Sequence, residues 1–283
     1  ESFRGIDIAL FSAGGDVSRK LVPAAIEQGA VCIDNTSAFR MDPDTPLIVP
    51  EVNIAQISDH KGVIANPNCS TIQLVAALKP LYDRFGISRI IVSTYQAVSG
   101  AGARAIDEMK RQSREVLETG FTDPELLPVA SLPVKHQIAF NAIPQIDKFT
   151  DNGFTYEEMK MINETKKILS DDSLEVTATC VRIPVVYGHS ESVYVELKRD
   201  FDMEEVRAAI ASAPGLALQD EPESQLYPLA THAAGKLDTY VGRLRRDLAN
   251  PRALNMWIVS DNLLKGAAWN AVQIAEYIAI EQK

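Results

Sequence analysis

Several features that would mark a specialised class of protein are scarce or missing in this 283-residue chain. It contains three cysteines, an odd number, so it lacks the disulfide framework of a small secreted domain. No stretch approaches the ~18 consecutive apolar residues that would span a bilayer. Lys and Arg number 28 against 38 Asp and Glu, for a net charge of −10, so the chain lacks the basic footprint of a general nucleic-acid binder. Internal repeats and low-complexity segments are also missing.

What is present is the composition of an ordinary globular protein. Hydrophobic residues make up 46% of the chain and charged residues 23%, which argues against extended disorder. The length suits one large domain or two ordinary ones. The few cysteines, together with a start that shows no signal-peptide pattern, predict a reduced, cytoplasmic protein. We expect no membrane partner, no nucleic-acid partner and no metal site.

The first third of the chain is typical of a parallel α/β sheet. An apolar strand, a turn, a helix and a second strand follow one another and form a β-α-β unit. A third short strand, a sharp turn and a second helix come later, after a loop rich in Pro and Asp. In chain order, the predicted ranges are the strand 6–11, the helix 17–29, the strand 30–34, the loop 41–61, the strand 63–66 and the helix 72–85.

The pattern changes after a β-branched strand over 89–97. Strands that alternate in polarity, as in an antiparallel sheet with one covered face, are predicted at 134–140, 175–184 and 192–197. Helical patterns are predicted at 103–119, 156–169, 203–213 and 263–281.

The expected fold is therefore α/β with two domains. Residues 1–68 and 257–283 would form a dinucleotide-binding domain around a Rossmann-like parallel sheet that is N-terminally incomplete. Residues 69–256 would form an α+β catalytic and dimerisation domain with a mostly antiparallel sheet.

Cys69 is the cysteine whose position indicates chemistry. It follows Pro67 and Asn68 at a strand-to-helix turn. Free backbone N–H groups and the positive end of the helix dipole there would stabilise a thiolate and lower the pKa of the thiol. Cys32 and Cys180 lie within predicted strands and are expected to be buried. By itself the pattern fits either a nucleophile or a bystander thiol beside an ordinary helix cap.

A nucleophilic cysteine needs a proton partner, and His189 has the most suggestive setting of the four histidines. It follows Gly188 at a turn between two predicted strands, where a side chain can be aimed into a cleft. The alternative is a hydrogen-bonded structural histidine. Arg182, seven residues earlier, lies on a strand with a buried pattern. Because an unpaired buried arginine is costly, we expect Arg182 to meet either a protein carboxylate or a substrate carboxylate.

Two segments carry a resemblance to a known family. Residues 66–71 (NPNCST) resemble the active-site turn of the aspartate-β-semialdehyde dehydrogenases, and residues 180–190 (CVRIPVVYGHS) are similar to that family's second signature. Their spacing also fits, and the resemblance extends from Ile6 to the final helix. Residues 34–40 (DNTSAFR) and 49–53 (VPEVN) look most like the Gram-positive bacterial branch.

The resemblance implies an oxidoreductase. It would reduce L-aspartyl 4-phosphate to L-aspartate 4-semialdehyde with NADPH and release phosphate, in the biosynthesis of lysine (by way of diaminopimelate), threonine and methionine. It would work in the cytoplasm as a homodimer or a tetramer.

The resemblance also assigns roles in the chemistry. Cys69 would form an acyl-enzyme thioester, Gln96 would orient the acyl group and His189 would act as acid and base. The residues implied to lie along the cofactor, NADP, are Ser12, Ala13, Gly14, Gly15, Ser99, Gly100 and Asn262.

The substrate would be held at three points. Arg182 would bind its α-carboxylate through a two-pronged pair. Glu157, or its neighbour Glu158, would meet the ammonium group. The residues implied to cradle the phosphate are Arg40, Asn68 and Lys160.

Each of these residues also has a structural alternative. Arg40, Glu157 and Lys160 fit surface charges, and the last two are at i,i+3 spacing, where they can pair with each other on a helix. The segment 99–102 fits a helix-start turn, and Asn262 fits a cap.

Members of the family open with a strand and a Gly-x-x-Gly-x-x-Gly loop that binds the cofactor pyrophosphate, and residues 1–11 do not supply it. We therefore expect roughly 60 further residues, about two units of ~30, to precede Ile6. The preference for NADP over NAD rests on the resemblance. On this reading, residues 1–283 alone would bind NADP(H) weakly or not at all and would be inactive.

Two alternative functions remain open at this point. An N-acetyl-γ-glutamyl-phosphate reductase uses the same chemistry, but its turn usually has glycine before the cysteine and Tyr-Pro after it. A non-catalytic paralogue or fragment could persist as a binding module. The joint presence of Cys69, Gln96, Arg182 and His189 argues against the second alternative.

Overall fold

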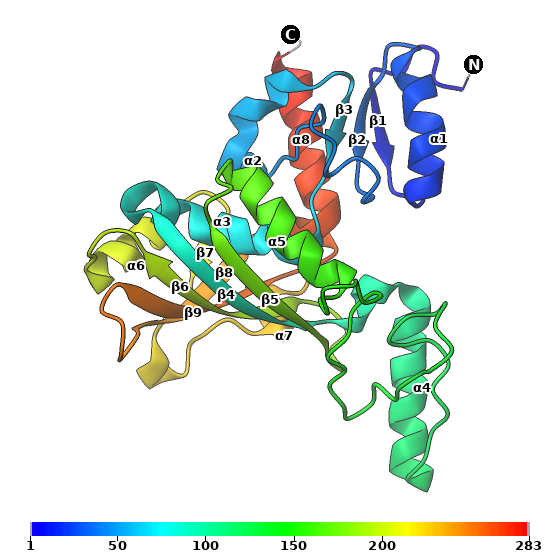
Figure 1. Cartoon of the computed structure of the whole chain (residues 1–283). Coiled ribbons are helices and arrows are strands. Elements are labelled where there is room, and N and C mark those ends of the chain that lie inside the picture. The colour runs from blue at the N-terminus through cyan, green and yellow to red at the C-terminus, as the bar shows by residue number, and fades with distance from the viewer. Residues whose placement is uncertain (1, 282–283) are drawn as a thin grey trace.

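The computed structural model describes residues 2–281 and contains two sheets (Figure 1). A three-stranded sheet has the order β1-β2-β3, and a six-stranded sheet has the order β5-β4-β6-β9-β8-β7. The predicted α/β fold, with a parallel sheet and a second α+β unit, is confirmed. Within residues 2–281, none of the helices has the length and apolar character needed to cross a membrane.

The smaller sheet is wholly parallel and is built from β1 (Ile8–Phe11), β2 (Val31–Asp34) and β3 (Val63–Ala65). Helix α1 (Gly15–Ile26) packs on one face and α8 (Trp269–Glu281) on the other. The segment 41–61, expected to be a loop, contains the short helix α2 (Pro50–Asn53) and a 3-10 helix (Ile54–Asp59). Proline at the first position of α2 costs nothing, because that N–H has no intrahelical acceptor.

The larger sheet is mixed but mostly antiparallel, as expected. The pairs β4–β6, β6–β9 and β8–β9 are antiparallel, whereas β4–β5 and β7–β8 are parallel. Its strands are β4 (Ile87–Gln96), β5 (Glu175–Arg182), β6 (His189–Leu197), β7 (Leu216–Leu218), β8 (Thr239–Arg246) and β9 (Ala253–Ser260).

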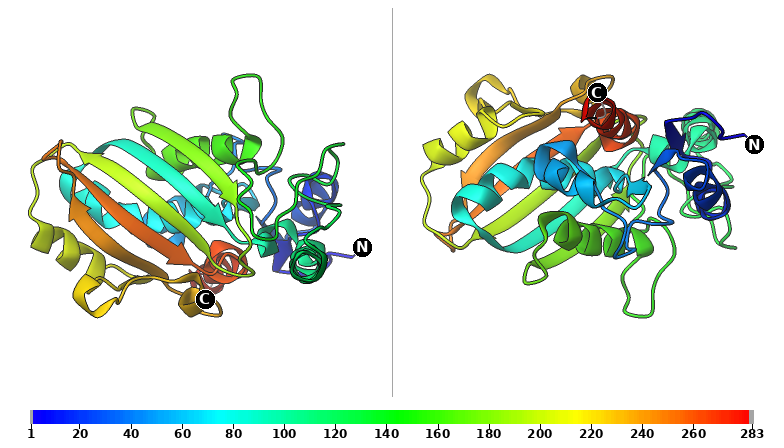
Figure 2. Two further views of the ribbon diagram at one scale, coloured as in Figure 1. Left: turned by 90° about the horizontal axis from the view of Figure 1, so that it is seen from below. Right: turned by 90° about the horizontal axis from the view of Figure 1, so that it is seen from above.

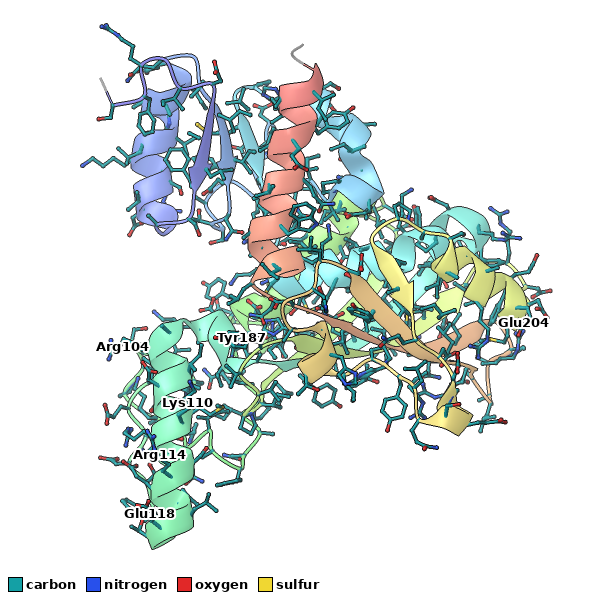
Figure 3. The ribbon with its side chains drawn as sticks, turned by 180° about the vertical axis from the view of Figure 1, so that it is seen from behind. Arg104, Lys110, Arg114, Glu118, Tyr187 and Glu204 are labelled. Atoms are coloured by element: carbon teal, nitrogen blue, oxygen red, sulfur yellow. The ribbon has the colours of Figure 1, made fainter. Side chains whose placement is uncertain are left out.

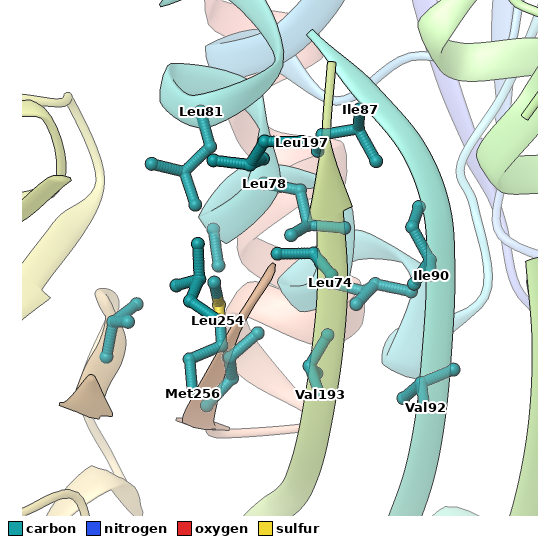
Figure 4. Packing of buried hydrophobic residues seen from close by; sticks show 14 of the residues in the cluster. Leu74, Leu78, Leu81, Ile87, Ile90, Val92, Val193, Leu197, Leu254 and Met256 are labelled. Atoms are coloured by element: carbon teal, nitrogen blue, oxygen red, sulfur yellow. The ribbon is translucent and has the colours of Figure 1, made fainter. Parts of the chain in front are cut away.

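Helices cover only one face of this sheet. Seen from above they lie in front of the strands, whereas seen from below the strands are bare (Figure 2). On the covered face, leucines of α3 (Cys69–Phe85) pack against strand residues such as Val193 and Leu254 (Figure 4). The other helices of this half are α5 (Tyr156–Leu169), α6 (Met203–Ala211) and α7 (Ala230–Ala233).

Helix α4 (Ala103–Thr119) projects away from both sheets (Figures 1 and 3). The strand predicted at 134–140 is absent, and irregular chain packs against α4 in its place. The amides of Ile138 and Ala139 donate to Oε1 of Gln112 on α4, at 2.8 and 3.2 Å. The prediction of a strand over 134–140 was therefore wrong, because this segment packs against a helix and not in a sheet.

Several boundaries also differ from the expectation. Helix α3 begins at Cys69, three residues earlier than predicted. His189 is the first residue of β6, directly after Gly188, whose φ is 89°. Strand β9 runs through residue 257, where a domain boundary was expected.

A buried ion pair fastens α2 to α8. Lys265, in the π-helical turn Leu264–Ala268 that leads into α8, is fully buried. Its ammonium group donates to Oε2 of Glu51 at 2.6 Å, Oδ1 of Asn270 at 3.0 Å and Oε1 of Gln273 at 2.8 Å. Burial lowers the pKa of Lys265, and Glu51 opposes that shift. The pair is fully hydrogen-bonded, which a buried pair needs in order to offset its desolvation.

Replacing Lys265 by methionine should therefore destabilise the protein strongly. The change leaves the Glu51 carboxylate buried without its cation, which costs about 3–5 kcal/mol. Urea denaturation measures the free energy of unfolding. As a control, Arg19→Met breaks an exposed pair with Asp16 and should cost less than about 1 kcal/mol. Similar losses for the two variants would contradict the prediction.

Candidate active site

A cavity of about 400 Å³ lies where the ends of several elements converge. The parallel strands β4 and β5 end side by side at Gln96 and Arg182, and the antiparallel β6 begins beside them at His189. Helix α3 adds Cys69. All eight residues predicted for catalysis or substrate binding line this cavity: Arg40, Asn68, Cys69, Gln96, Glu157, Lys160, Arg182 and His189.

Cys69 occupies the first turn of α3, and Asn68 is the residue that fixes it there. The Asn68 side-chain oxygen accepts hydrogen bonds from the amides of Ser70 and Thr71, at 3.0 and 3.3 Å. This is an N-cap, which satisfies donors that would otherwise have no partner. On the other side, a β-carbon added at Gly266 would lie 3.0 Å from the β-carbon of Cys69. The position of the thiol is therefore bounded from two directions.

The expected low pKa of the Cys69 thiol is not found in the ligand-free chain. Desolvation by burial and then the Glu157 carboxylate raise the pKa to about 12. Arg182, Arg40 and the amide of Ser70 act in the opposite direction but do not prevail. The prediction from the helix start considered neither the burial of the thiol nor the Glu157 carboxylate. With its pKa raised by both, the thiol is protonated at neutral pH.

His189 is fully buried and makes one hydrogen bond through its ring. The amide of Ala97 donates to its Nδ1 at 3.0 Å, and Nε2 has no partner within the described residues. Desolvation, and then the Arg182 cation, lower the pKa of His189 to about 3. The imidazole is therefore neutral at physiological pH.

Arg182 is 7% exposed and donates one hydrogen bond, to the carbonyl oxygen of Ala97 at 2.7 Å. Burial lowers the pKa of this arginine, although Glu157 opposes the shift. Among residues 2–281, no carboxylate oxygen lies within 4 Å of its guanidinium. Of the two anions expected for it, the protein carboxylate is thus excluded for the part of the chain described, and a ligand carboxylate stays a prediction.

The neighbouring residues Glu157 and Glu158 make different contacts. Glu158 completes a capping box with Thr155 at the start of α5 and accepts from the amide of Cys180 at 3.0 Å. Glu157 faces the cavity and accepts from Asn68 at 2.8 Å and from Gln96 at 3.1 Å. Burial alone would raise the pKa of Glu157, but Lys160 and these two hydrogen bonds lower it to about 2. Of the two candidates, the geometry therefore selects Glu157.

The residues expected to hold phosphate are engaged with protein groups in the free chain. Nη1 of Arg40 lies 3.1 Å from Oε1 of Glu164. Lys160 bridges Asp147 at 3.1 Å and Glu157 at 3.2 Å, so the i,i+3 pairing considered from the sequence is present. Both cations still line the cavity, whereas the Asn68 amide is used by the helix cap and by Glu157.

Sequence reasoning missed several residues of the site. Glu164 holds Arg40 and also accepts from the amide of Asn68 at 2.7 Å. A signal for it exists, because residues 157, 160 and 164 form one charged stripe along α5. Ser37 and the irregular segment 126–130 also line the cavity and carry no comparable sequence signal.

The predicted cofactor residues fall into two groups, and Gly100 alone lines the cavity. Ser99 and Asn262 hydrogen-bond each other at 3.0 Å, and Asn262 also accepts from the amide of Gly188 at 3.0 Å. They therefore border the turn that leads to His189. A β-carbon at Gly100 would come within 3.0 Å of the Arg182 guanidinium, so glycine keeps that space open.

The second group is the turn of Ser12, Ala13, Gly14 and Gly15 at the start of α1. Gly14 has a φ of 101°, and no side chain caps the helix. Uncapped amides and small residues at a helix N-terminus fit an anionic group such as a diphosphate. A chain of side-chain amides connects this turn to the turn that leads into α3, because Asn35 donates to Ser12 at 3.3 Å and accepts from Asn66 at 2.7 Å.

Neutralising Glu157 should make Cys69 more reactive. The carboxylate raises the pKa of the thiol, so Glu157→Gln lowers it and increases the thiolate fraction at a given pH. The rate of iodoacetamide labelling of Cys69 at pH 8, followed by mass spectrometry, should rise by about tenfold per unit of pKa change. Asp147→Asn is the matched control, because Asp147 contacts Lys160 but does not act on the thiol. An unchanged rate in Glu157→Gln would show that desolvation alone sets the pKa.

Comparison with known proteins gives a consistent result. Residues 1–60 match the model described as "Semialdehyde dehydrogenase, NAD binding domain", and residues 78–265 match "Semialdehyde dehydrogenase, dimerisation domain". The chain is 59% identical over 277 residues to an aspartate-semialdehyde dehydrogenase of Bacillus subtilis, which covers 98% of this chain and 80% of the relative. It is 53% identical over 282 residues to that of Aquifex aeolicus, covering 99% and 81%.

The same likeness holds in three dimensions. The crystal structure of aspartate semialdehyde dehydrogenase II of Vibrio cholerae, complexed with ASA, superimposes with a TM-score of 0.91 at 49% identity, over 98% of this chain and 80% of that one. The parallel sheet and the mixed sheet thus belong to a known architecture. On these grounds the chain belongs to the aspartate-semialdehyde dehydrogenase family.

Proposed function

We propose that this chain carries out the NADPH-dependent reductive dephosphorylation of L-aspartyl 4-phosphate to L-aspartate 4-semialdehyde, with Cys69 as the nucleophile. Family membership supports the reaction class. The observation that carries the substrate assignment is the guanidinium of Arg182. It is buried beside Cys69 and has no ion pair among the described residues, so it is set to receive a carboxylate. The comparisons do not favour an N-acetyl-γ-glutamyl-phosphate reductase.

The charges around the cavity match the three charged groups of this substrate. Arg182 binds the α-carboxylate, and the Glu157 carboxylate binds the ammonium group. Arg40 and Lys160 receive the phosphoryl group, while Asn68 holds the turn between them. The local positive charge operates within a chain of net charge −10, so it is the local field that attracts the anion.

The chemistry proceeds by covalent catalysis. The sulfur of Cys69 attacks the acyl carbon, the S–C bond forms, and the bond from that carbon to the phosphate oxygen breaks. Gln96 and His189 flank the acyl group. Bound NADPH supplies the hydride that reduces the resulting thioester to the aldehyde.

Each of the two sheets belongs to a domain with a different function. We propose that residues 1–68 and 257–283 form the dinucleotide-binding domain, with the Ser12–Gly15 turn along the dinucleotide. Residues 69–256 form the catalytic and dimerisation domain. The bare face of its sheet, with Ile91 42% exposed and the rings of Tyr95 and Trp257 in a tilted pair with centroids 5.5 Å apart, receives a second copy of the chain. Three free thiols suit a cytoplasmic enzyme.

Substituting the nucleophile tests the proposal directly. Cys69→Ser in the full-length enzyme should lower the rate of NADPH formation from L-aspartate 4-semialdehyde, phosphate and NADP by at least about 10³. Circular dichroism should show an unchanged fold. Cys32→Ala is the control, because it alters a thiol in the parallel-sheet core. Activity of Cys69→Ser within tenfold of wild type would remove Cys69 from the mechanism.

Arg182→Lys tests the carboxylate assignment. Lysine keeps the positive charge but loses the planar fork, so one charge-assisted hydrogen bond of about 1.5–3 kcal/mol should be lost. We expect kcat/KM for the semialdehyde to fall by about 10- to 100-fold. Arg19→Lys, on the exposed face of α1, should leave it unchanged. Equal efficiency of Lys and Arg at position 182 would rule out two-point binding.

A further inference from the structure

Lys167, in the last turn of α5, holds the loop that carries Arg40. Its ammonium group donates to the main-chain carbonyl oxygens of Arg40, Asp42 and Thr45, at 2.8, 2.7 and 2.8 Å. An ammonium group has three protons, so its whole donor capacity is directed at this loop. Arg40 lines the active-site cavity, and Lys167 does not belong to that lining among the described residues. Lys167 therefore contacts the loop from outside the cavity.

The loop depends on these hydrogen bonds because it has few of its own. Residues 41–44 are exposed and lie in neither a helix nor a strand. The carbonyl oxygens of Arg40 and Thr45 accept from no other donor within residues 2–281, whereas that of Asp42 also accepts from the amide of Thr45 at 3.2 Å. Without the ammonium group, the main chain at Arg40 would lose its link to α5.

The ordinary reason for a lysine at the end of a helix does not explain these contacts. A positive charge in the last turn is favourable beside the negative end of the helix dipole. The preceding residue, Lys166, fits that description, because it donates to the carbonyl oxygen of Asp172, six residues further on, at 3.3 Å. Lys167 instead reaches carbonyl groups 122–127 positions earlier in the chain. The helix dipole accounts for its charge but not for three hydrogen bonds to one remote loop.

Lys167 continues the charged stripe of α5 by one more turn. Its spacing from Glu157, Lys160 and Glu164 keeps it on the same face of the helix. Glu164 pairs with the guanidinium of Arg40 at 3.1 Å, and Lys167 binds the main chain of the same residue. The loop follows β2 of the parallel sheet, whereas α5 packs against β5 of the mixed sheet. Helix α5 thus holds both ends of Arg40, although the two elements belong to different sheets.

The guanidinium of Arg40 is ordered but not fully satisfied. Its Nη1 lies 3.1 Å from Oε1 of Glu164, and its Nη2 donates to the carbonyl oxygen of Asn35 at 2.9 Å. Its Nε is buried and has no partner among the described residues. Because a buried donor without a partner is unfavourable, Arg40 keeps hydrogen-bonding capacity for a ligand anion.

We propose that Lys167 is a positioning residue of the phosphate site, which acts through the main chain of Arg40 and sets the affinity for phosphate. The inference rests on the proposed function of the cavity, in which Arg40 receives the phosphoryl group. Binding an anion with a mobile loop costs conformational entropy, and that cost lowers the affinity. Lys167 removes the cost by ordering the loop before phosphate arrives.

The other end of the cavity does not rely on this loop. Arg182 is fixed by β5 and by its hydrogen bond to the carbonyl oxygen of Ala97 at 2.7 Å. Cys69 is fixed by α3 and the cap that Asn68 provides. Loss of the Lys167 ammonium group should therefore weaken the use of phosphate and leave the binding of the semialdehyde unchanged. A general loss of structure would affect both substrates.

Steady-state kinetics of the full-length enzyme tests this split, with NADPH formation from L-aspartate 4-semialdehyde, phosphate and NADP as the readout. Lys167→Met keeps the aliphatic stem and should lower kcat/KM for phosphate by about tenfold or more, while KM for the semialdehyde stays within about twofold. Lys166→Met is the matched control, because it removes the same charge one position away and has no bond to the loop. Circular dichroism checks the fold. Equal changes for both substrates in Lys167→Met, or an equal loss in both variants, would overturn the proposal.

A double-mutant cycle tests whether Lys167 acts through Arg40. Arg40→Gln should lower kcat/KM for phosphate, which is measured from the linear dependence of the rate on phosphate concentration. Adding Lys167→Met to Arg40→Gln should then cause little further loss, because the side chain that Lys167 positions is already missing. Losses that multiply in the double variant would show that Lys167 acts independently of Arg40 and would contradict the inference.

These measurements separate the inference from the proposed function. If the wild-type enzyme does not oxidise L-aspartate 4-semialdehyde in the presence of phosphate and NADP, the function is wrong, and the role of Lys167 fails with it. If the enzyme is active and Lys167→Met behaves like Lys166→Met, the function stands and the inference alone is wrong.

Discussion

The Glu157 carboxylate is the contact on which the rest of the site depends. From α5 it reaches Asn68 before α3, Gln96 at the end of β4 and Lys160 on its own helix. One oxygen accepts from both amides, so it sets the orientation of Gln96 and holds the residue that caps the helix of Cys69. Because three elements meet at one buried anion, their relative positions are fixed by hydrogen bonds at their ends as well as by packing.

The same arrangement explains how an acidic protein keeps a cationic cavity. Every positive charge near the thiol except Arg182 is matched in the free chain by a buried or half-buried carboxylate: Arg40 by Glu164, and Lys160 by Asp147 and Glu157. The cations are thus held in place without the cost of an unpaired charge. An incoming anion competes with protein carboxylates at one end of the cavity and meets an unmatched guanidinium at the other. The two ends of the cavity therefore differ in how readily they accept an anion.

Much of the fold follows from the sequence. The predicted ranges of α4 and α5 agree with the structure, because long amphipathic periods determine a helix almost alone. The segment 134–140 fails for the opposite reason: a short alternation does not say whether the covered face meets a sheet or a helix. Strands β8 and β9 were not separately predicted, since their pairing joins residues distant in sequence.

For the site, the resemblance selected eight of the residues that line the cavity, but their protonation states and hydrogen bonds could not be predicted from spacing. The high pKa of Cys69 depends on burial that no local pattern reveals, and then on Glu157, 88 positions along the chain. The ring of His189 is held by a hydrogen bond from the amide of Ala97. Such properties arise only once the strand ends meet.

Gly266 has a consequence of a different kind. It belongs to the π-helical turn that Lys265 anchors between α2 and α8, and it abuts the β-carbon of Cys69. This turn lies between α8 and the β-carbon of Cys69 and keeps the two apart. A displacement of α8 relative to the mixed sheet would move this turn against Cys69, so the position of the thiol depends on the position of that helix.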